Sequence, residues 1–164
     1  MATITAFKFD TPGGAEQMLD LVKDLSKQQL ITLQDAAIVT WPEGKKKPKT
    51  RQLESLAGSG ALSGAFWGML FGLIFFIPFF GMAVGAAMGA LTGKFSDYGI
   101  DDDFIKSVGQ KVTEGTSALF LMTSGAVVDK VGDAVKQKGW KFEVLSTNLS
   151  NEQEKQLRED FGLE

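Results

Sequence analysis

An uncharged stretch from Ser55 to Gly93 most constrains what this chain can fold into. It reads SLAGSGALSGAFWGMLFGLIFFIPFFGMAVGAAMGALTG and contains no Asp, Glu, Lys or Arg over 39 positions. Glycine recurs at every fourth position in two series, which are Gly60, Gly64, Gly68 and Gly72, then Gly81, Gly85, Gly89 and Gly93. Pro78 lies between the two series. The pattern predicts two apolar helices that fold back on each other as a glycine-zipper hairpin.

The glycine positions also predict how the two helices meet. If the turn is centred between Phe76 and Ile77, every glycine of the first series lies opposite one of the second, as Gly68 does with Gly85. Facing glycines let two backbones approach closely, which favours helix association in lipid. A glycine in a helix costs about 1 kcal/mol relative to alanine, so this many in register indicate a close-packed interface. That interface lies either within one chain or between copies of it.

The lengths of the two apolar segments bear on how the hairpin meets a membrane. Residues 55–77 would form a helix of about 34 Å, enough to span a hydrocarbon core of about 30 Å. Residues 79–93 would form one of about 22 Å, which is short for a span. The turn between them is apolar, so we expect its tip to stay in lipid or against other subunits, with two full spans as an alternative. The bulky side chains expected to face lipid or neighbouring copies are Phe66, Trp67, Phe71, Phe75, Phe76, Phe79 and Phe80.

The two flanks of this stretch have the pattern of an α+β domain. Alternating or β-branched runs predict strands at 3–9, 36–41, 117–123 and 140–145. Apolar residues at helical spacing predict a helix after Pro12 and another over 126–138. The order strand–helix–strand, repeated, is the split β-α-β pattern of a ferredoxin-like domain. We therefore predict that 1–51 and 97–164 form one soluble ferredoxin-like domain, and that 52–96 form the inserted hairpin, projecting from one end.

Three helix starts carry residues suited to capping. Thr11 precedes the first helix, Asp101 opens the acidic triplet 101–103, and Ser150 precedes a charged C-terminal helix. The triplet could alternatively hold a divalent cation, but it lacks the spacing of a calcium loop, so capping is the favoured role.

Five of the 17 basic residues fall within seven positions just before the uncharged stretch. They are Lys45, Lys46, Lys47, Lys49 and Arg51. Such a run can be a solvated loop. Its position favours contact with anionic lipid headgroups, because juxtamembrane basic residues mark the cytoplasmic side of a membrane.

Composition narrows the classes of function. The net charge of −3 does not suggest nucleic acid as a partner, and the chain has neither cysteine nor histidine. No nucleophile–base pair or metal-ligand set stands out, so we expect no enzyme, cofactor or metal. The glycines at 58–64 suggest a dinucleotide-binding turn, but no strand precedes them. The N-terminus has no signal-peptide pattern, so the soluble domain is expected on the cytoplasmic side.

Several motifs together resemble a known family. They are the Gly/Ala/Phe hairpin, YGIDDDFIK at 98–106, GTSALF at 115–120 and the tail from Leu149–Ser150 to Leu157–Arg158. With these the chain resembles the bacterial domain-of-unknown-function family 1269, described as membrane proteins. The resemblance implies membrane association and a stress-linked setting, and it supplies no substrate and no active-site residues.

Three hypotheses of function follow. The first is a non-enzymatic, self-assembling membrane protein whose hairpin inserts in the bilayer and packs into homo-oligomers. The second is a soluble homo-oligomeric shell, ring or filament whose hairpins are buried between subunits, because so large an apolar patch could not stay exposed on a monomer. The third is a membrane-anchored small-molecule-binding or catalytic domain, with Asp101–Asp103 and Glu114 as its candidate residues.

Overall fold

Strands from both flanks of the uncharged stretch form one antiparallel sheet. The computed structural model describes residues 2–53, 64–76 and 85–161. Its strands are β1 (Ala2–Phe9), β2 (Asp35–Thr40), β3 (Lys49–Gln52), β4 (Ser117–Ser124) and β5 (Glu143–Leu149). They lie in the order β3-β2-β4-β1-β5, and each neighbouring pair is antiparallel. The protein is therefore an α+β protein, as the sequence predicts.

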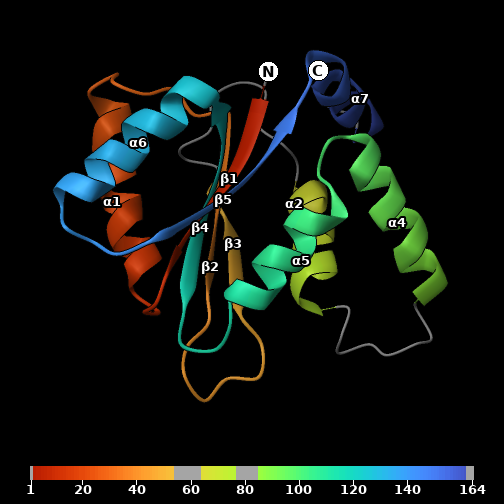
Figure 1. Cartoon of the computed structure of the whole chain (residues 1–164), viewed down its shortest axis with the longest axis horizontal. Coiled ribbons are helices and arrows are strands. Elements are labelled where there is room, and N and C mark those ends of the chain that lie inside the picture. The colour runs from red at the N-terminus through yellow and green to blue at the C-terminus, as the bar shows by residue number, and fades with distance from the viewer. Residues whose placement is uncertain (1, 54–63, 77–84, 162–164) are drawn as a thin grey trace.

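Two crossover helices cover one face of this sheet. Helix α1 (Gly14–Lys27) joins β1 to β2, and α6 (Gly125–Gln137) joins β4 to β5 (Figure 1). Their buried residues recur at helical spacing, as Val131 and Val135 do on α6. Together with Phe7 and Leu119 of the strands, they form one of the two apolar cores.

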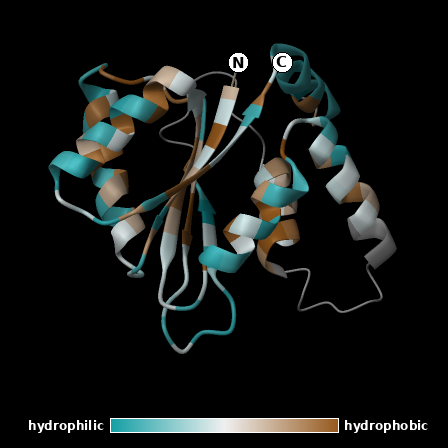
Figure 2. Ribbon diagram, viewed as in Figure 1, coloured by the Kyte–Doolittle hydropathy of each residue, from teal (hydrophilic) through white to brown (hydrophobic). Residues whose placement is uncertain are grey.

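The opposite face of the sheet is covered by the region that contains part of the uncharged stretch. Helix α2 (Gly64–Phe71) continues into a π-helix, η2 (Gly72–Phe76), and α5 (Asp102–Lys111) packs beside η2. Helices α4 (Gly85–Asp97) and α7 (Asn151–Asp160) lie further from the sheet (Figure 1). Figure 2 shows apolar residues on α2 and the strands, and polar residues on the outer side of α6.

The central strands of the sheet are thus buried on both sides. Every residue of β1 is buried, as are the first seven of β4. On the α2 side the central strands present four alanines among larger residues such as Ile4 and Phe120, and these alanines are Ala2, Ala6, Ala37 and Ala118. These leave room for large side chains from the covering helices. The sequence-based interpretation expected the hairpin to project from one end of the molecule. Helix α2 and η2 instead lie on the sheet.

Most predicted elements are present with shifted ends. The fourth strand begins at Glu143, three residues later than predicted, and continues to Leu149. Strand β3 was not predicted, because KTRQ has no apolar alternation and its four residues are exposed or half-buried. Ser150 caps α7 as predicted, in a capping box with Gln153.

The predicted cap of the first helix is wrong. Helix α1 begins at Gly14, with Gly13 as its N-cap and no capping side chain. The amide of Ala15 instead donates to Ser117 Oγ of β4 (2.9 Å), and that hydroxyl donates to the carbonyl of Thr11 (2.7 Å). The start of α1 is thus held by a strand about a hundred residues away, which no local signal reveals.

Candidate functional site

The aromatic residues of α2 point into the core of the chain. Phe66, Trp67 and Phe71 are at most 3% exposed, and so is Phe75 of η2. The Phe71 and Trp67 rings lie 5.1 and 6.4 Å from the ring of Phe120 on β4. For these four residues the structure differs from the expectation that they face lipid or other copies, because the alanine-rich sheet face accommodates them. Phe79 and Phe80 lie outside the described residues, as does the side chain of Phe76.

A buried hydrogen bond fixes α2 to the sheet. The indole Nε1 of Trp67 donates to Asp35 Oδ2 at 2.9 Å, and the amide of Ala36 donates to Oδ1 at 2.8 Å. Asp35 is fully buried and Trp67 is 2% exposed. A buried carboxylate needs such donors, so the contact sets both the position and the rotation of α2. Sequence reasoning missed Asp35, because an acidic residue before a strand is typical of a loop.

The glycines of α2 and α4 lie on the surface. A Cβ atom added at Gly68, Gly72, Gly89 or Gly93 would meet no described atom within 4 Å, and one at Gly64 would lie 3.5 Å from Gln52 Oε1. Among the residues that the structure describes, Gly64 and Gly89 therefore do not make the close contact expected of a facing pair. Gly60 and Gly81 lie outside these residues, and of Gly85 only the backbone is described.

The predicted headgroup-binding residues are divided between a turn and a strand. Lys45, Lys46 and Lys47 lie in the turn between β2 and β3 and are exposed, whereas Lys49 and Arg51 belong to β3. The turn is positioned by Trp41, whose indole donates to the carbonyl of Lys45 at 2.9 Å.

This basic turn adjoins the end of η2. The rings of Trp41 and Phe75 meet edge-to-face with centroids 6.4 Å apart. In the view of Figure 1 the β2–β3 turn lies at the bottom, and the C-terminal end of η2 and the N-terminal end of α4 are the lower ends of those helices. The sequence between those two helix ends, 77–84, is IPFFGMAV. We call the side of the fold that carries the β2–β3 turn and these two helix ends the basic end.

The candidate carboxylates have structural contacts. Asp101 accepts a hydrogen bond from the amide of Phe104 (2.8 Å) and caps α5, as predicted. Asp102 pairs with Lys106 at 2.8 Å, which raises the pKa of that lysine. Glu114 accepts a hydrogen bond from the amide of Gly44. Within 2–53, 64–76 and 85–161, no cluster of three acidic side chains suited to a metal ion is found.

A buried tyrosine joins the end of α4 to α7. The Tyr98 hydroxyl donates to Asp160 Oδ2 at 2.6 Å, and Lys94 lies 3.9 Å from the same oxygen. Burial, followed by the hydrogen bond to Asp160, raises the pKa of Tyr98 far above its usual value. The same hydrogen bond lowers the pKa of Asp160. This contact is a structural clamp between helices.

The described helices do not include a membrane span. None of those within 2–53, 64–76 and 85–161 combines the length and the apolar character that crossing a bilayer requires.

The fold defines an α+β protein whose antiparallel sheet has helices on both faces. In the sequence, a basic segment precedes its uncharged stretch. The sequence profile of the family described as "Protein of unknown function (DUF1269)" matches residues 61–162. The chain belongs to this family, as its motifs suggest. No curated protein and no solved structure matches the chain.

Proposed function

We propose that this protein is a non-enzymatic, self-assembling protein that binds membranes through its basic end. In this proposal the lysine turn attracts anionic headgroups, the apolar segment 77–84 enters the bilayer, and the glycine surfaces of α2 and α4 pack against other copies. The soluble part of the chain lies on the cytoplasmic side, where the positive bias of membrane proteins is found.

The observation that carries the proposal is the contact between Trp41 and Phe75. It packs Trp41, whose indole binds the carbonyl of Lys45 in the lysine turn, against Phe75 of the helix that leads into the apolar segment. Basic residues beside an apolar insert combine the two attractions that hold a peripheral protein on a membrane, charge and apolar burial. Either attraction alone gives weak binding, and their placement at one end lets both act in one orientation.

The two sides of α2 support the self-assembly part of the proposal. The aromatic side is occupied by the sheet of the same chain, whereas no described residue covers the space beside Gly68 and Gly72. A close-packed glycine interface would therefore form between copies. Glycine surfaces allow backbones of neighbouring helices to approach closely, which is how helices associate within lipid.

For the fold we propose the ferredoxin-like class with a glycine hairpin inserted between its second and third strands. Without β3, the strand order is β2-β4-β1-β5, and both crossovers carry a helix on the same face. This order and these crossovers support a split β-α-β arrangement.

Flotation with lipid vesicles tests the membrane part of the proposal. We expect the protein to float with vesicles that contain anionic lipid and to require detergent for extraction. Changing Lys45, Lys46 and Lys47 together to Gln should weaken this binding, and a matched control changes Lys130, Lys136 and Lys138 near α6. The proposal is wrong if wild-type protein stays unbound as a monomer, or if both triple variants bind equally.

A soluble homo-oligomer is the alternative, favoured by the burial of Phe66, Trp67 and Phe71 in the core of their own chain. With those rings covered, an assembly needs no lipid to shield them. A large, lipid-free particle purified without detergent would support this alternative over the membrane proposal.

A further inference from the structure

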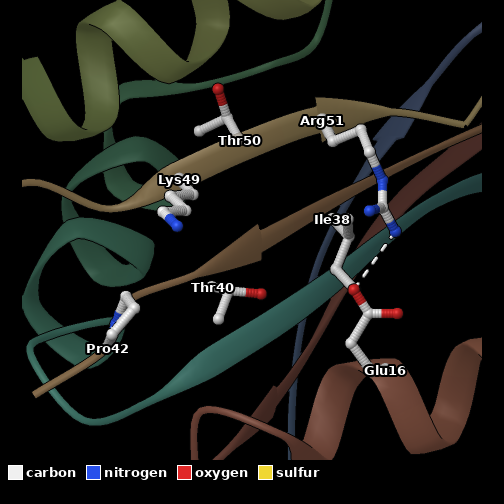
Figure 3. A pocket seen from close by; sticks show the side chains of 7 residues that line it. All are labelled: Glu16, Ile38, Thr40, Pro42, Lys49, Thr50 and Arg51. Atoms are coloured by element: carbon white, nitrogen blue, oxygen red, sulfur yellow. Dashed lines mark hydrogen bonds and ion pairs between the residues drawn. The ribbon is translucent and has the colours of Figure 1, made fainter.

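A hollow lies between α1 and the edge of the sheet at β3. Its volume is about 390 Å³, and it is lined by Glu16, Ile38, Thr40, Pro42, Lys49, Thr50 and Arg51 (Figure 3). This volume lies within the range of about 300–1,000 Å³ typical of small-molecule sites.

The strand register brings the polar groups of this hollow together. Lys49 pairs with Thr40 across the strands, and Arg51 pairs with Ile38. Residues two apart on a strand share a face, so Lys49 and Arg51 lie on the same side of β3. Figure 3 shows both side chains over β2, with Glu16 reaching toward Arg51 from α1.

The charges in the hollow favour an anion. Arg51 pairs with Glu16 at 3.1 Å, and both side chains are about half exposed. Within the described part of the chain, the ammonium of Lys49 makes no ion pair or hydrogen bond. Two cations against one carboxylate leave an excess positive charge in the hollow. Ile38 and Pro42 add apolar surface beside it.

We propose that this hollow binds a phosphate ester. The phosphate lies between Lys49 and Arg51 and accepts a hydrogen bond from the Thr40 hydroxyl, while its small organic group rests on Ile38 and Pro42. The guanidinium of Arg51 suits phosphate because its planar N–H groups can donate two parallel hydrogen bonds. In the empty site Glu16 holds the Arg51 guanidinium in place, and the bound phosphate takes the place of the Glu16 carboxylate as its partner.

This inference deepens the proposed function by adding a phosphate site at Lys49 and Arg51, on the α1 face of the sheet, and it rests on that function for a lipid source of the ligand. A soluble phosphate ester and a glycerophospholipid headgroup share the same chemistry. The two sources are separated by testing a soluble probe and vesicles on the same variants.

The first arm titrates glycerol 3-phosphate into the full chain and follows backbone amide signals by NMR. Lys49→Gln should weaken binding about tenfold or more, because hydrogen bonds to charged groups contribute about 1.5–3 kcal/mol. Lys136→Gln removes the same charge from the exposed surface of α6 and should change binding less than about twofold. Glu16→Gln should strengthen binding about two- to fivefold, since an exposed ion pair contributes at most about 1 kcal/mol.

The second arm measures flotation with vesicles of phosphatidylcholine alone or with phosphatidic acid. A lipid source predicts that Lys49→Gln reduces flotation with phosphatidic acid more than Lys46→Gln does. If glycerol 3-phosphate binds with the expected contrast and vesicles do not, the site stands with a soluble ligand and the membrane proposal fails. If vesicles bind, but Lys49→Gln behaves like Lys136→Gln with glycerol 3-phosphate and like Lys46→Gln with vesicles, the site is refuted and the membrane proposal stands.

Discussion

Replacing surface glycines of α2 and α4 by alanine should change folding and assembly in opposite directions. Gly68, Gly89 and Gly93 lie inside helices, and an added Cβ at each would meet no atom of the described residues within 4 Å. Alanine is favoured over glycine in a helix interior by about 1 kcal/mol, so the triple variant should gain about 3 kcal/mol. For a chain of this size each kcal/mol raises the melting temperature by about 2–4 °C, which gives about 6–12 °C in total.

The same three methyl groups should weaken assembly. In a close-packed glycine interface each methyl would occupy the space of the neighbouring backbone, so copies could no longer approach. Thermal unfolding by circular dichroism, at a dilution where the chain is monomeric, measures the gain in stability. Sedimentation velocity in mild detergent, at higher concentration, measures the loss of assembly.

Gly132→Ala is the matched control. Gly132 lies inside α6, away from the glycine series, and a Cβ there also meets no described atom within 4 Å. It should gain about 1 kcal/mol and leave assembly unchanged. A triple variant that is more stable and still assembles like wild type would refute the glycine interface. A triple variant that is no more stable would refute the conclusion that these positions are open.

Three further changes test other parts of the structure. Trp67→Phe leaves the buried Asp35 carboxylate without its indole donor, so the free energy of unfolding, measured in urea, should fall by about 1–3 kcal/mol. The same change should cost less in a chain that already carries Asp35→Asn. Tyr98 is the sole tyrosine, so ultraviolet titration should show its ionisation well above pH 10. Because its folded-state pKa is raised, its contribution to stability should be intact below pH 10 and decline above it, an effect that Tyr98→Phe removes. Gly14→Ala places a Cβ 2.4 Å from a β1 side-chain atom and should destabilise by about 1–3 kcal/mol, whereas Gly13→Ala, with open space, should not.

Local signals in the sequence were sufficient for most of the sheet and its crossover helices. The valines of α6 are spaced so that Val131 and Val135 share a buried side, and Ser150 with Gln153 forms a cap within four residues. Such features depend on neighbours in the sequence. Strand β3 was missed because an exposed edge strand of charged residues lacks the alternation that marks a half-buried strand.

The orientation of α2 could not be predicted for a different reason. Its sequence shows one aromatic side and one glycine side, but not which side meets the sheet. The answer depends on alanines such as Ala6 and Ala37, which lie on one face only after the strands have paired. The basic run was visible in the sequence, whereas the hollow beside it requires the pairing of Thr40 with Lys49 and the approach of Glu16.

The contact of α2 with the sheet has a consequence for the order of events during synthesis. Trp67 and Phe71 pack on Phe120, which the ribosome adds about 50 residues later. At translation rates of about 5–20 residues per second, that separation corresponds to roughly 2.5–10 s. Strand β1 also cannot pair until late in synthesis, because its partners β4 and β5 come from the last third of the chain. For those seconds the aromatic side of the newly made helix has no complete sheet to cover it.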